Sequence, residues 1–409
     1  MLNSNSSGTK FTQPRLPLPP AILGSEEGSF AYYTVTGRMP AIARRVIAEN
    51  KFPPIIIEKL ETLATELSDG KVRPLKDDGG EDVESWSKYV EPFAGMRWLD
   101  VPWFFAETYF YRSILEATNY FQPGDWQGVD PFGYQKRLGL HASMDAIPAL
   151  TNFRIEGDAD ESRNDFIKLL YFDLWGNRAD LSLWPAGESD RSNDPLPEQT
   201  NILVDLSSQI ADKVASFDKV RIDIVADNAG FELVCDLCLA DFLLTNNAAG
   251  TVYLHLKSHP TFVSDATIKD VHYTLEILEA NKNKEVLRSA LRLQDYIARD
   301  RLRLQDDLFW TSPLAFWEMP ESLQQDLSLS SLILVKGDAN YRRILGDRHW
   351  PFTTPFEDIA CYFPSPMAAL RTLKSELAAG LHPSQIEALN QQDPNWLTNG
   401  ERGVIQFVI

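Results

Sequence analysis

The stretch from 221 to 244 constrains the fold most, because a strand, a polar turn and a helix follow one another there. Residues 221–225 alternate polar and apolar side chains and are rich in β-branched residues, which predicts a strand. Asp227 and Asn228 come next, and apolar residues recur with helical spacing from Phe231 onward. In open α/β sheets, ligands bind where a strand ends and a helix begins, and the helix dipole favours an anion there. The stretch therefore predicts a ligand site in an α/β fold.

Strands alternate with helices through the second half of the chain. Strands are expected at 251–257 and 332–335, with a short strand-like segment at 261–264, and VIQFVI closes the chain. Residues 358–381 are expected to form a short strand followed by a basic helix. Such alternation predicts a parallel or mixed sheet with helices on both faces.

Composition changes along the chain and suggests three parts. Residues 1–28 are rich in Ser, Asn and Pro and are expected to form a flexible arm. Residues 29–190 read as a mainly helical subdomain, and residues 191–409 as the α/β core that binds metal and substrate.

Charged and polar residues in the first half allow two readings each. An aromatic-rich helix is expected over 99–121, and we interpret its Glu107 and Arg112 as a buried ion pair. Asn177 and Asp180 follow a Gly-Asn turn signal. They are candidates for a pocket, and a turn or capping role fits their spacing equally well.

Bulk properties exclude several classes of function. The chain has 409 residues and a formal net charge of −19, which argues against a nucleic-acid surface. Three cysteines give no disulfide framework, and no stretch has the length and apolarity needed to cross a bilayer. We see no secretory signal and expect a cytoplasmic protein, with the nucleus possible. Oligomeric state and protein partners leave no trace in the sequence.

Oxygen ligands gather at the ends of the expected strands. Asp227, Asn228 and Asp265 offer carboxylate and amide oxygens without thiolate or imidazole, a set that suits Mg²⁺ or Mn²⁺. The alternative is that Asp227 and Asn228 merely cap the following helix. One residue suffices for a cap, so the further acidic strand ends favour a metal site slightly.

Basic side chains follow the later strands in an otherwise acidic chain. A guanidinium group matches two phosphate oxygens at once, so these residues are candidates for a phosphate clamp. The alternative is a solvated helix face. The residues concerned are Arg342, Arg343, Arg371 and Lys374.

Other familiar motifs give no support. Cys235 and Cys238 lie within one predicted helix with no second pair, which favours core packing over redox or zinc chemistry. The histidines lack metal-ligand spacing. The sequence has no G-x-S-x-G, Walker A or G-x-G-x-x-G motif. The missing dinucleotide motif leaves S-adenosylmethionine binding untested.

Five stretches together resemble a known family. WGNRADLS, VADNAGFELVCDLCLADFL, FVSD, VKGDANYRR and RTLK, in this order and spacing, resemble the damage-control phosphatases, formerly the domain-of-unknown-function 89 family. The resemblance covers the chain from about residue 30 to its end. RTLK resembles the RTxK signature of the third subfamily, which includes sugar-phosphate phosphatases and a protein also described as an acidic-residue (glutamate) methyltransferase. The implied fold is a Rossmann-like α/β/α sandwich core with an amino-terminal helical subdomain.

The resemblance also implies site residues. Asp227, Asn228 and Asp265 match the family's metal ligands, with Mn²⁺ the typical metal and Co²⁺, Ni²⁺ or Mg²⁺ possible replacements. Asp227 and Asn228 are expected to touch substrate as well. Ala339 stands where we expect Leu, a minor departure. The further substrate-binding positions implied are Asp338, Ala339, Asn340, Tyr341, Arg342, Arg371, Thr372 and Lys374.

These observations lead to a functional hypothesis: a metal-dependent phosphatase for small sugar phosphates of the fructose 1-phosphate or fructose 6-phosphate type. Its partners are a small phosphorylated metabolite and a divalent metal. Asp227 or Asp265 is expected to hold or deprotonate the attacking water. Arg371, Lys374 and Lys336 are expected to balance the phosphoryl charge. The alternatives are an S-adenosylmethionine-dependent protein-glutamate O-methyltransferase and an interaction protein with a vestigial pocket.

Overall fold

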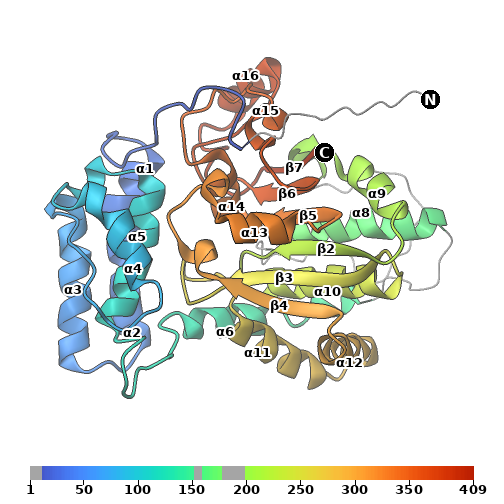
Figure 1. Ribbon diagram of the computed structural model, residues 1–409, viewed down its shortest axis with the longest axis horizontal. Helices are drawn as coiled ribbons and strands as arrows, with labels where there is room; N and C mark the ends of the chain where they lie inside the picture. Colours follow the sequence, from blue (N-terminus) through green and yellow to red (C-terminus); the bar gives the residue numbers. More distant parts are fainter. Residues whose placement is uncertain (1–11, 152–158, 177–198) are drawn as a thin grey trace.

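The computed structural model describes residues 12–151, 159–176 and 199–409. At its centre lies a seven-stranded sheet with the order β1-β7-β6-β5-β2-β3-β4 (Figure 1). Helices cover the sheet, and further helices pack beside it, which confirms the predicted α/β fold class. The strands are β1 (Ile202–Asp205), β2 (Val220–Val225), β3 (Ala249–Lys257), β4 (Leu302–Asp307), β5 (Leu332–Lys336), β6 (Met367–Thr372) and β7 (Gly403–Val408).

The strand order creates a crevice at the middle of the sheet. The chain winds from β2 to β3 and β4 on one side, and then continues through β5 and β6 on the other side of β2. All these strands pair in parallel. Beyond them, β7 pairs antiparallel with β6, and β1 pairs parallel with β7, so β1 and β7 run opposite to the other five strands. A reversal of winding opens a crevice at the carboxyl ends of the two strands involved. Asp227 lies just after the end of β2, and Asp338 lies just after the end of β5, so the sheet brings both residues to this crevice.

Two hydrophobic cores lie on opposite faces of the sheet. Alternate residues of a strand point to opposite faces, so each central strand contributes to both cores. Ile222 and Ile224 of β2 belong to one core, which extends over Leu169 and Leu237 in the covering helices. Val225 belongs to the other core, which continues into the amino-terminal helices.

The amino-terminal helices form a separate stack, drawn in blue at the left of Figure 1. The most central of them, α5, is buried at every position, as its aromatic sequence predicts. Glu107 and Arg112 of this helix do not pair with each other, so the ion pair expected from the sequence is wrong. Arg112 binds Asp78 and Asp82, whereas Glu107 binds Arg342 of the core. The helices are α1 (Phe30–Tyr33), α2 (Met39–Glu49), α3 (Pro54–Asp69), α4 (Val83–Val90) and α5 (Trp103–Ala117).

The remaining helices follow α5 in the chain. Three helices that the sequence assigned to the helical subdomain, α6 to α8, contribute side chains to the core over one sheet face. The later helices are α6 (Gly133–Ala142), α7 (Ile147–Leu150), α8 (Ala159–Trp175), α9 (Ser207–Ala215), α10 (Phe231–Thr245), α11 (Ile268–Glu279), α12 (Lys284–Ala298), α13 (Glu321–Leu327), α14 (Asp338–Leu345), α15 (Phe356–Ala360) and α16 (Pro383–Gln392). A π-helical turn and short 3-10 turns lie at Thr34–Arg38, Glu91–Phe93, Trp98–Asp100, Gln199–Asn201, Leu308–Thr311 and Phe316–Glu318.

The described part of the amino-terminal arm is held against the molecule. The backbone N–H of Arg15 donates to Asp358 O at 2.9 Å, and that of Ile22 donates to Asp347 O at 3.0 Å. The same segment accepts from Trp103 N at the start of α5. Residues 12–28 therefore bridge the helical stack and the core. The expected boundary between 190 and 191 lies outside the described residues and stays a prediction.

Local structure departs from the sequence expectation in several places. Residues 262–264 form a turn, so the strand-like segment expected at 261–264 is wrong. The short strand expected at the start of 358–381 is wrong as well, because Phe356–Ala360 forms α15. The RTLK motif lies at the end of β6 and in the loop after it, so the expected basic helix is also wrong. Strands β1 and β4 had not been expected.

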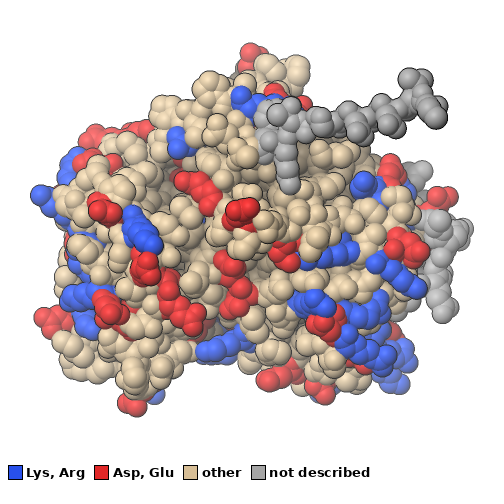
Figure 2. Space-filling view, viewed as in Figure 1, with Lys and Arg blue, Asp and Glu red and all other residues tan. Residues whose placement is uncertain are grey.

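Acidic side chains are spread over the visible surface in Figure 2, as the net charge requires. Basic side chains gather most densely at the lower right, where Figure 1 draws α12, and acidic ones lie among them. Within the described residues, the helices are too short or too polar to span a membrane.

Candidate active site

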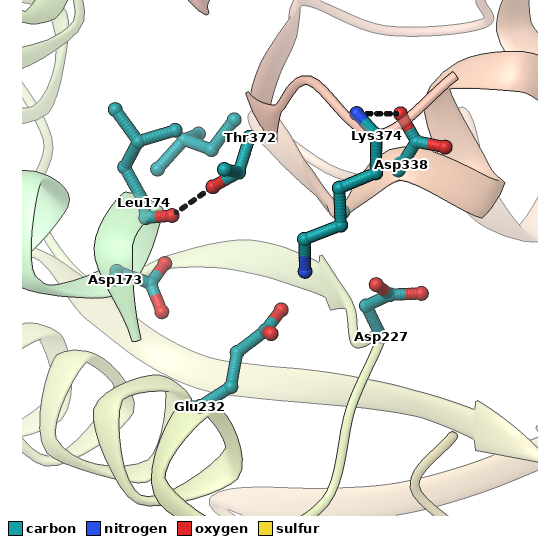
Figure 3. Close-up of a pocket in the computed structure, with 9 residues that line it drawn as sticks. Asp173, Leu174, Asp227, Glu232, Asp338, Thr372 and Lys374 are labelled. Atoms are coloured by element: carbon teal, nitrogen blue, oxygen red, sulfur yellow. Dashed lines mark hydrogen bonds between the residues drawn. The ribbon is translucent and has the colours of Figure 1, made fainter. Parts of the chain in front are cut away.

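A cavity opens at the crevice between β2 and β5 (Figure 3). Carboxylates from α8, α10, α14 and the turn after β2 face it, and one ammonium group reaches into it. The cavity therefore combines strand ends with the first turn of α10 and the last turn of α8. Its lining residues are Asp173, Leu174, Asp227, Glu232, Gly337, Asp338, Leu370, Thr372 and Lys374.

The Asp227–Asn228 turn is fixed by side-chain hydrogen bonds. Asn228 Nδ2 donates to Asp227 Oδ2 at 2.8 Å and to Glu232 Oε2 at 2.9 Å. Both donor hydrogens of the amide are thereby used, so its oxygen is oriented away from Glu232. The other carboxylate oxygen, Asp227 Oδ1, is buried without a hydrogen-bond partner. A buried acceptor without a donor is rare in folded proteins and indicates a missing cation or donor.

Asp265 is brought to this turn by backbone pairing. A β-bridge joins Asn228 to Asp265, and Ala266 N donates to Asp227 O at 2.8 Å. The carboxylate lies 3.3 Å from the ammonium of Lys257 at the end of β3. Asp227 and Asn228 are adjacent in the sequence, and Asp265 follows 37 residues after Asn228. The structure thus brings the three predicted metal ligands together.

Burial, together with nearby carboxylates, raises the pKa of two of these ligands. Burial raises the pKa of Asp227 well above its usual range, and the negative charges of Asp265 and Glu232 raise it further. Burial also raises the pKa of Asp265, although Lys257 acts in the opposite direction. Both carboxylates would gain stability as anions from a nearby cation.

The residues fit a hard divalent metal in part. Within the described residues, no three His, Cys, Asp or Glu side chains form a metal-binding group. A metal at this position would therefore depend on the Asn228 amide oxygen beside the carboxylates of Asp227 and Asp265. The unsatisfied Asp227 oxygen and the all-oxygen donor set agree with such a site.

Asp338 organises the opposite side of the cavity. Its Oδ1 accepts from Arg371 Nε at 2.7 Å, from Ser375 Oγ at 3.0 Å and from the Lys374 backbone at 3.1 Å. Although burial acts to raise it, Arg371 and Arg342 lower the pKa of Asp338. An ionised Asp338 therefore ties the start of α14 to the loop that follows β6.

Lys374 is the ammonium group of the cavity. In Figure 3 its side chain extends from this loop toward Glu232, with Asp173 and Asp227 on either side. It makes no ion pair within the described residues. Its neighbour Thr372 uses its hydroxyl to bind Leu174 O at 2.8 Å and so closes the wall of the cavity.

The other predicted cations point elsewhere. Arg371 is buried, and its guanidinium nitrogens bind Asp338, Ser375 and the Leu377 carbonyl. Arg342 binds Asp347 and Glu107 and lies over the Trp103 ring. Arg343 donates to backbone carbonyls of residues 309–314.

Lys336 lies behind the cavity wall, 2.7 Å from Asp173 Oδ1. In the predicted substrate loop, Asp338 lines the cavity, whereas the side chains of Asn340 and Tyr341 bind protein atoms. Asn340 binds the carbonyls of Ala226 and Lys336, and Tyr341 binds Gln406. Ala339 is half-buried and is not among the residues that line the cavity.

Several residues at the site escaped sequence reasoning: Asp173, Glu232, Lys257 and Gly337. Glu232 lies one helical turn after Asn228, a spacing that could have indicated it. Asp173 lies in the last turn of α8, far from Asp227 in the sequence, and no local sequence pattern indicates it. Asn177 and Asp180, which we considered for a pocket, lie outside the described residues.

Comparison with known proteins agrees with the sequence resemblance. Residues 34–389 match the family described as "Damage-control phosphatase ARMT1-like domain". Proteins named damage-control phosphatase ARMT1 are 35% identical in Danio rerio and 36% in Mus musculus; both alignments cover 95% of this chain, with 97% and 98% of the relatives. The Homo sapiens protein of that name is 33% identical over 95% of this chain and 98% of its own length.

Among solved structures, a Pyrococcus horikoshii protein of the same domain-of-unknown-function 89 family aligns with a TM-score of 0.48. It is 13% identical, and the alignment covers 91% of this chain and 96% of that one. The family match and the relatives together show that the chain belongs to the ARMT1-like damage-control phosphatases.

Proposed function

We propose that this member of a damage-control phosphatase family is a metal-dependent phosphatase for small sugar phosphates, of the fructose 1-phosphate or fructose 6-phosphate type. The observation that carries the proposal is the unsatisfied oxygen of buried Asp227 in a cavity that also holds Lys374. Such a cavity is suited to bind a cation at the Asp227 oxygen and a phosphate group at the Lys374 ammonium.

Charge explains why we propose a metal. Four carboxylates line the cavity, Asp173, Asp227, Glu232 and Asp338, against the single ammonium of Lys374. A phosphate dianion entering this cavity would be repelled at short range. A divalent ion held by Asp227, Asn228 and Asp265 would supply the missing positive charge and polarise the phosphoryl group. Mn²⁺ is our first choice, with Co²⁺, Ni²⁺ and Mg²⁺ as alternatives.

The remaining functions are binding of the phosphoryl group, activation of the water and positioning, and each is assigned to a residue of the chain itself. The Lys374 ammonium balances negative charge on the phosphoryl oxygens and holds the group against the Asp227 side. Asp227 or Asp265 holds or deprotonates the attacking water. Arg371 and Lys336 act indirectly in this scheme, because they position Asp338 and Asp173.

The decisive experiment is phosphate release from a panel of phosphorylated metabolites, with Mn²⁺ and with a chelator. We expect hydrolysis of fructose 1-phosphate or fructose 6-phosphate that the chelator abolishes. Asp227→Asn should lose both Mn²⁺ binding, measured by calorimetry, and phosphate release, while its circular dichroism stays normal. Hydrolysis at the wild-type rate by this variant would refute the assignment.

The methyltransferase alternative gains no specific support from the described residues, so we do not propose it. The same screen still separates the two activities. Methyl transfer to protein carboxylates in the presence of chelator, without phosphate release, would favour that alternative.

A further inference from the structure

The orientation of the Asn228 amide group decides whether this residue can bind a cation. Its oxygen is an acceptor and suits a metal ion, whereas its NH₂ group is a donor and repels one. The two ends of an amide have nearly the same size, so packing alone does not choose between them. Hydrogen-bond partners therefore have to fix the amide.

Three side chains hold the Asn228 amide in one orientation. Its nitrogen donates to Glu232 Oε2 at 2.9 Å and to Asp227 Oδ2 at 2.8 Å. Its oxygen accepts a hydrogen bond from the hydroxyl of Ser264, the residue before Asp265. An amide oxygen can accept two hydrogen bonds, so the Ser264 hydroxyl leaves one position of this oxygen for a metal.

Glu232 is held on the cavity wall next to this amide. It is a buried residue in the first turn of α10, four residues after Asn228. Its second oxygen, Oε1, lies 3.7 Å from the Lys336 ammonium. In Figure 3 the Glu232 side chain lies between those of Asp173 and Asp227. A carboxylate accepts hydrogen bonds and does not donate them, so Glu232 allows only the nitrogen of the amide to face it.

We propose that Glu232 is a positioning residue: it accepts the hydrogen bond from the Asn228 nitrogen and thereby turns the amide oxygen toward the metal. The inference rests on the proposed metal-dependent function and adds a residue that acts through Asn228. This role also accounts for a carboxylate in a cavity that has to admit a phosphate group, where its charge would otherwise be a disadvantage.

Two matched variants separate the hydrogen bond of Glu232 from its charge. Glu232→Gln and Glu232→Met both remove the negative charge, and their side chains have nearly the same length. Only glutamine keeps an oxygen that can accept from the Asn228 nitrogen. The difference between the two variants therefore measures the effect of the acceptor. Thermal melting shows whether both proteins are folded.

The measured quantity is the dissociation constant for Mn²⁺, obtained by calorimetric titration of the metal alone. We expect Glu232→Met to bind Mn²⁺ about ten- to a hundredfold more weakly than Glu232→Gln, the effect of losing a hydrogen-bond partner of a metal ligand. Equal dissociation constants in the two variants would overturn the role of Glu232 and leave the proposed function intact. No Mn²⁺ binding by the wild-type protein would overturn both.

Ser264 provides a second test that does not need the methionine variant. Ser264→Ala removes the hydroxyl that binds the Asn228 oxygen. In the wild type Glu232 still fixes the amide, whereas the glutamine of Glu232→Gln can accept or donate and fixes it less well. Ser264→Ala should therefore weaken Mn²⁺ binding more in the Glu232→Gln background than in the wild type. An equal loss of affinity in both backgrounds would overturn the inference.

Discussion

Two groups of charged side chains lie near the carboxyl end of the sheet, and they differ in how their hydrogen bonds are satisfied. Arg342 and Arg371 are buried with every side of their guanidinium groups bound to protein atoms. In the other group, Asp227 is buried as well, but its Oδ1 has no hydrogen-bond partner. Charged groups whose hydrogen bonds are all made within the protein stabilise the structure, whereas a charged group at a cavity with an unused hydrogen-bonding position is suited to bind a ligand.

Arg342 gives the largest expected effect on stability. It binds Glu107 of α5 and Asp347 after α14, so Arg342→Met would leave two buried carboxylates without their cation. We expect a loss of about 3–5 kcal/mol in the free energy of unfolding, measured by urea denaturation. The control is Arg299→Met, which breaks an exposed pair with Asp295 and should cost at most about 1 kcal/mol. If Arg342→Met reduced activity and kept normal stability, Arg342 would belong to the site.

Lys374 should behave in the opposite way. Because its ammonium makes no ion pair within the described residues, Lys374→Met should change the melting temperature little. It should lower kcat about 10²- to 10³-fold, because positive charge on the phosphoryl oxygens is lost. Steady-state kinetics with saturating Mn²⁺ measures this. A large stability loss with near-normal kcat would place Lys374 with the structural cations.

The contrast between Arg371 and Lys374 also shows what sequence can and cannot reveal. Both belong to RTLK, and both looked equally suited to bind phosphate. The distinction depends on Asp338, Ser375 and a carbonyl of Leu377, which enclose the arginine once the loop has folded. Whether a side chain finds all its hydrogen-bond partners within the protein depends on the tertiary structure. The sequence therefore predicted where the charges lie, but not which of them are left to bind a ligand.

For the fold, the errors have similar causes. The two strands that were not expected, β1 and β4, are the edges of the sheet, and their residues are mostly half-buried. Edge strands carry a weak apolar pattern, so their sequence gives little signal. In contrast, β6 is buried on both faces, and its Ala- and Leu-rich sequence has the composition of a helix. The central strand β2 and its polar turn were recognised because alternation and turn chemistry agreed there.

Gly337 tests how closely the two sides of the crevice meet. Its φ is +84°, and a Cβ at this position would lie 1.9 Å from Asp227 Oδ2. Gly337→Ala must therefore displace Asp227, and we expect kcat/KM to fall about a hundredfold, as for a displacement of about 1 Å at a catalytic group. Gly139→Ala in α6 is the control, because its Cβ would meet no atom within 4 Å. Equal activity of the two variants would show that Asp227 has more freedom than the structure implies.

The smallest predicted effect connects the helical stack to the metal site. Phe262 and Val263, just before Asp265, have φ angles of 46° and 66°, a conformation that is rare for a β-branched residue. The Phe262 ring lies 5.0 Å from the Tyr111 ring of α5 and 5.9 Å from that of Phe104. This packing offsets the backbone strain and fixes the loop that carries Asp265.

Phe262→Ala should therefore raise the dissociation constant for Mn²⁺ about tenfold, the lower end of the effect expected when support for a metal ligand is lost. Calorimetric titration of the metal alone measures this without relying on activity. Phe93→Ala is the matched control, because Phe93 is also half-buried and packs on Phe105 of α5 at 4.5 Å. If both variants weakened Mn²⁺ binding equally, α5 would contribute only general stability, and the helical stack would have no specific part in holding Asp265.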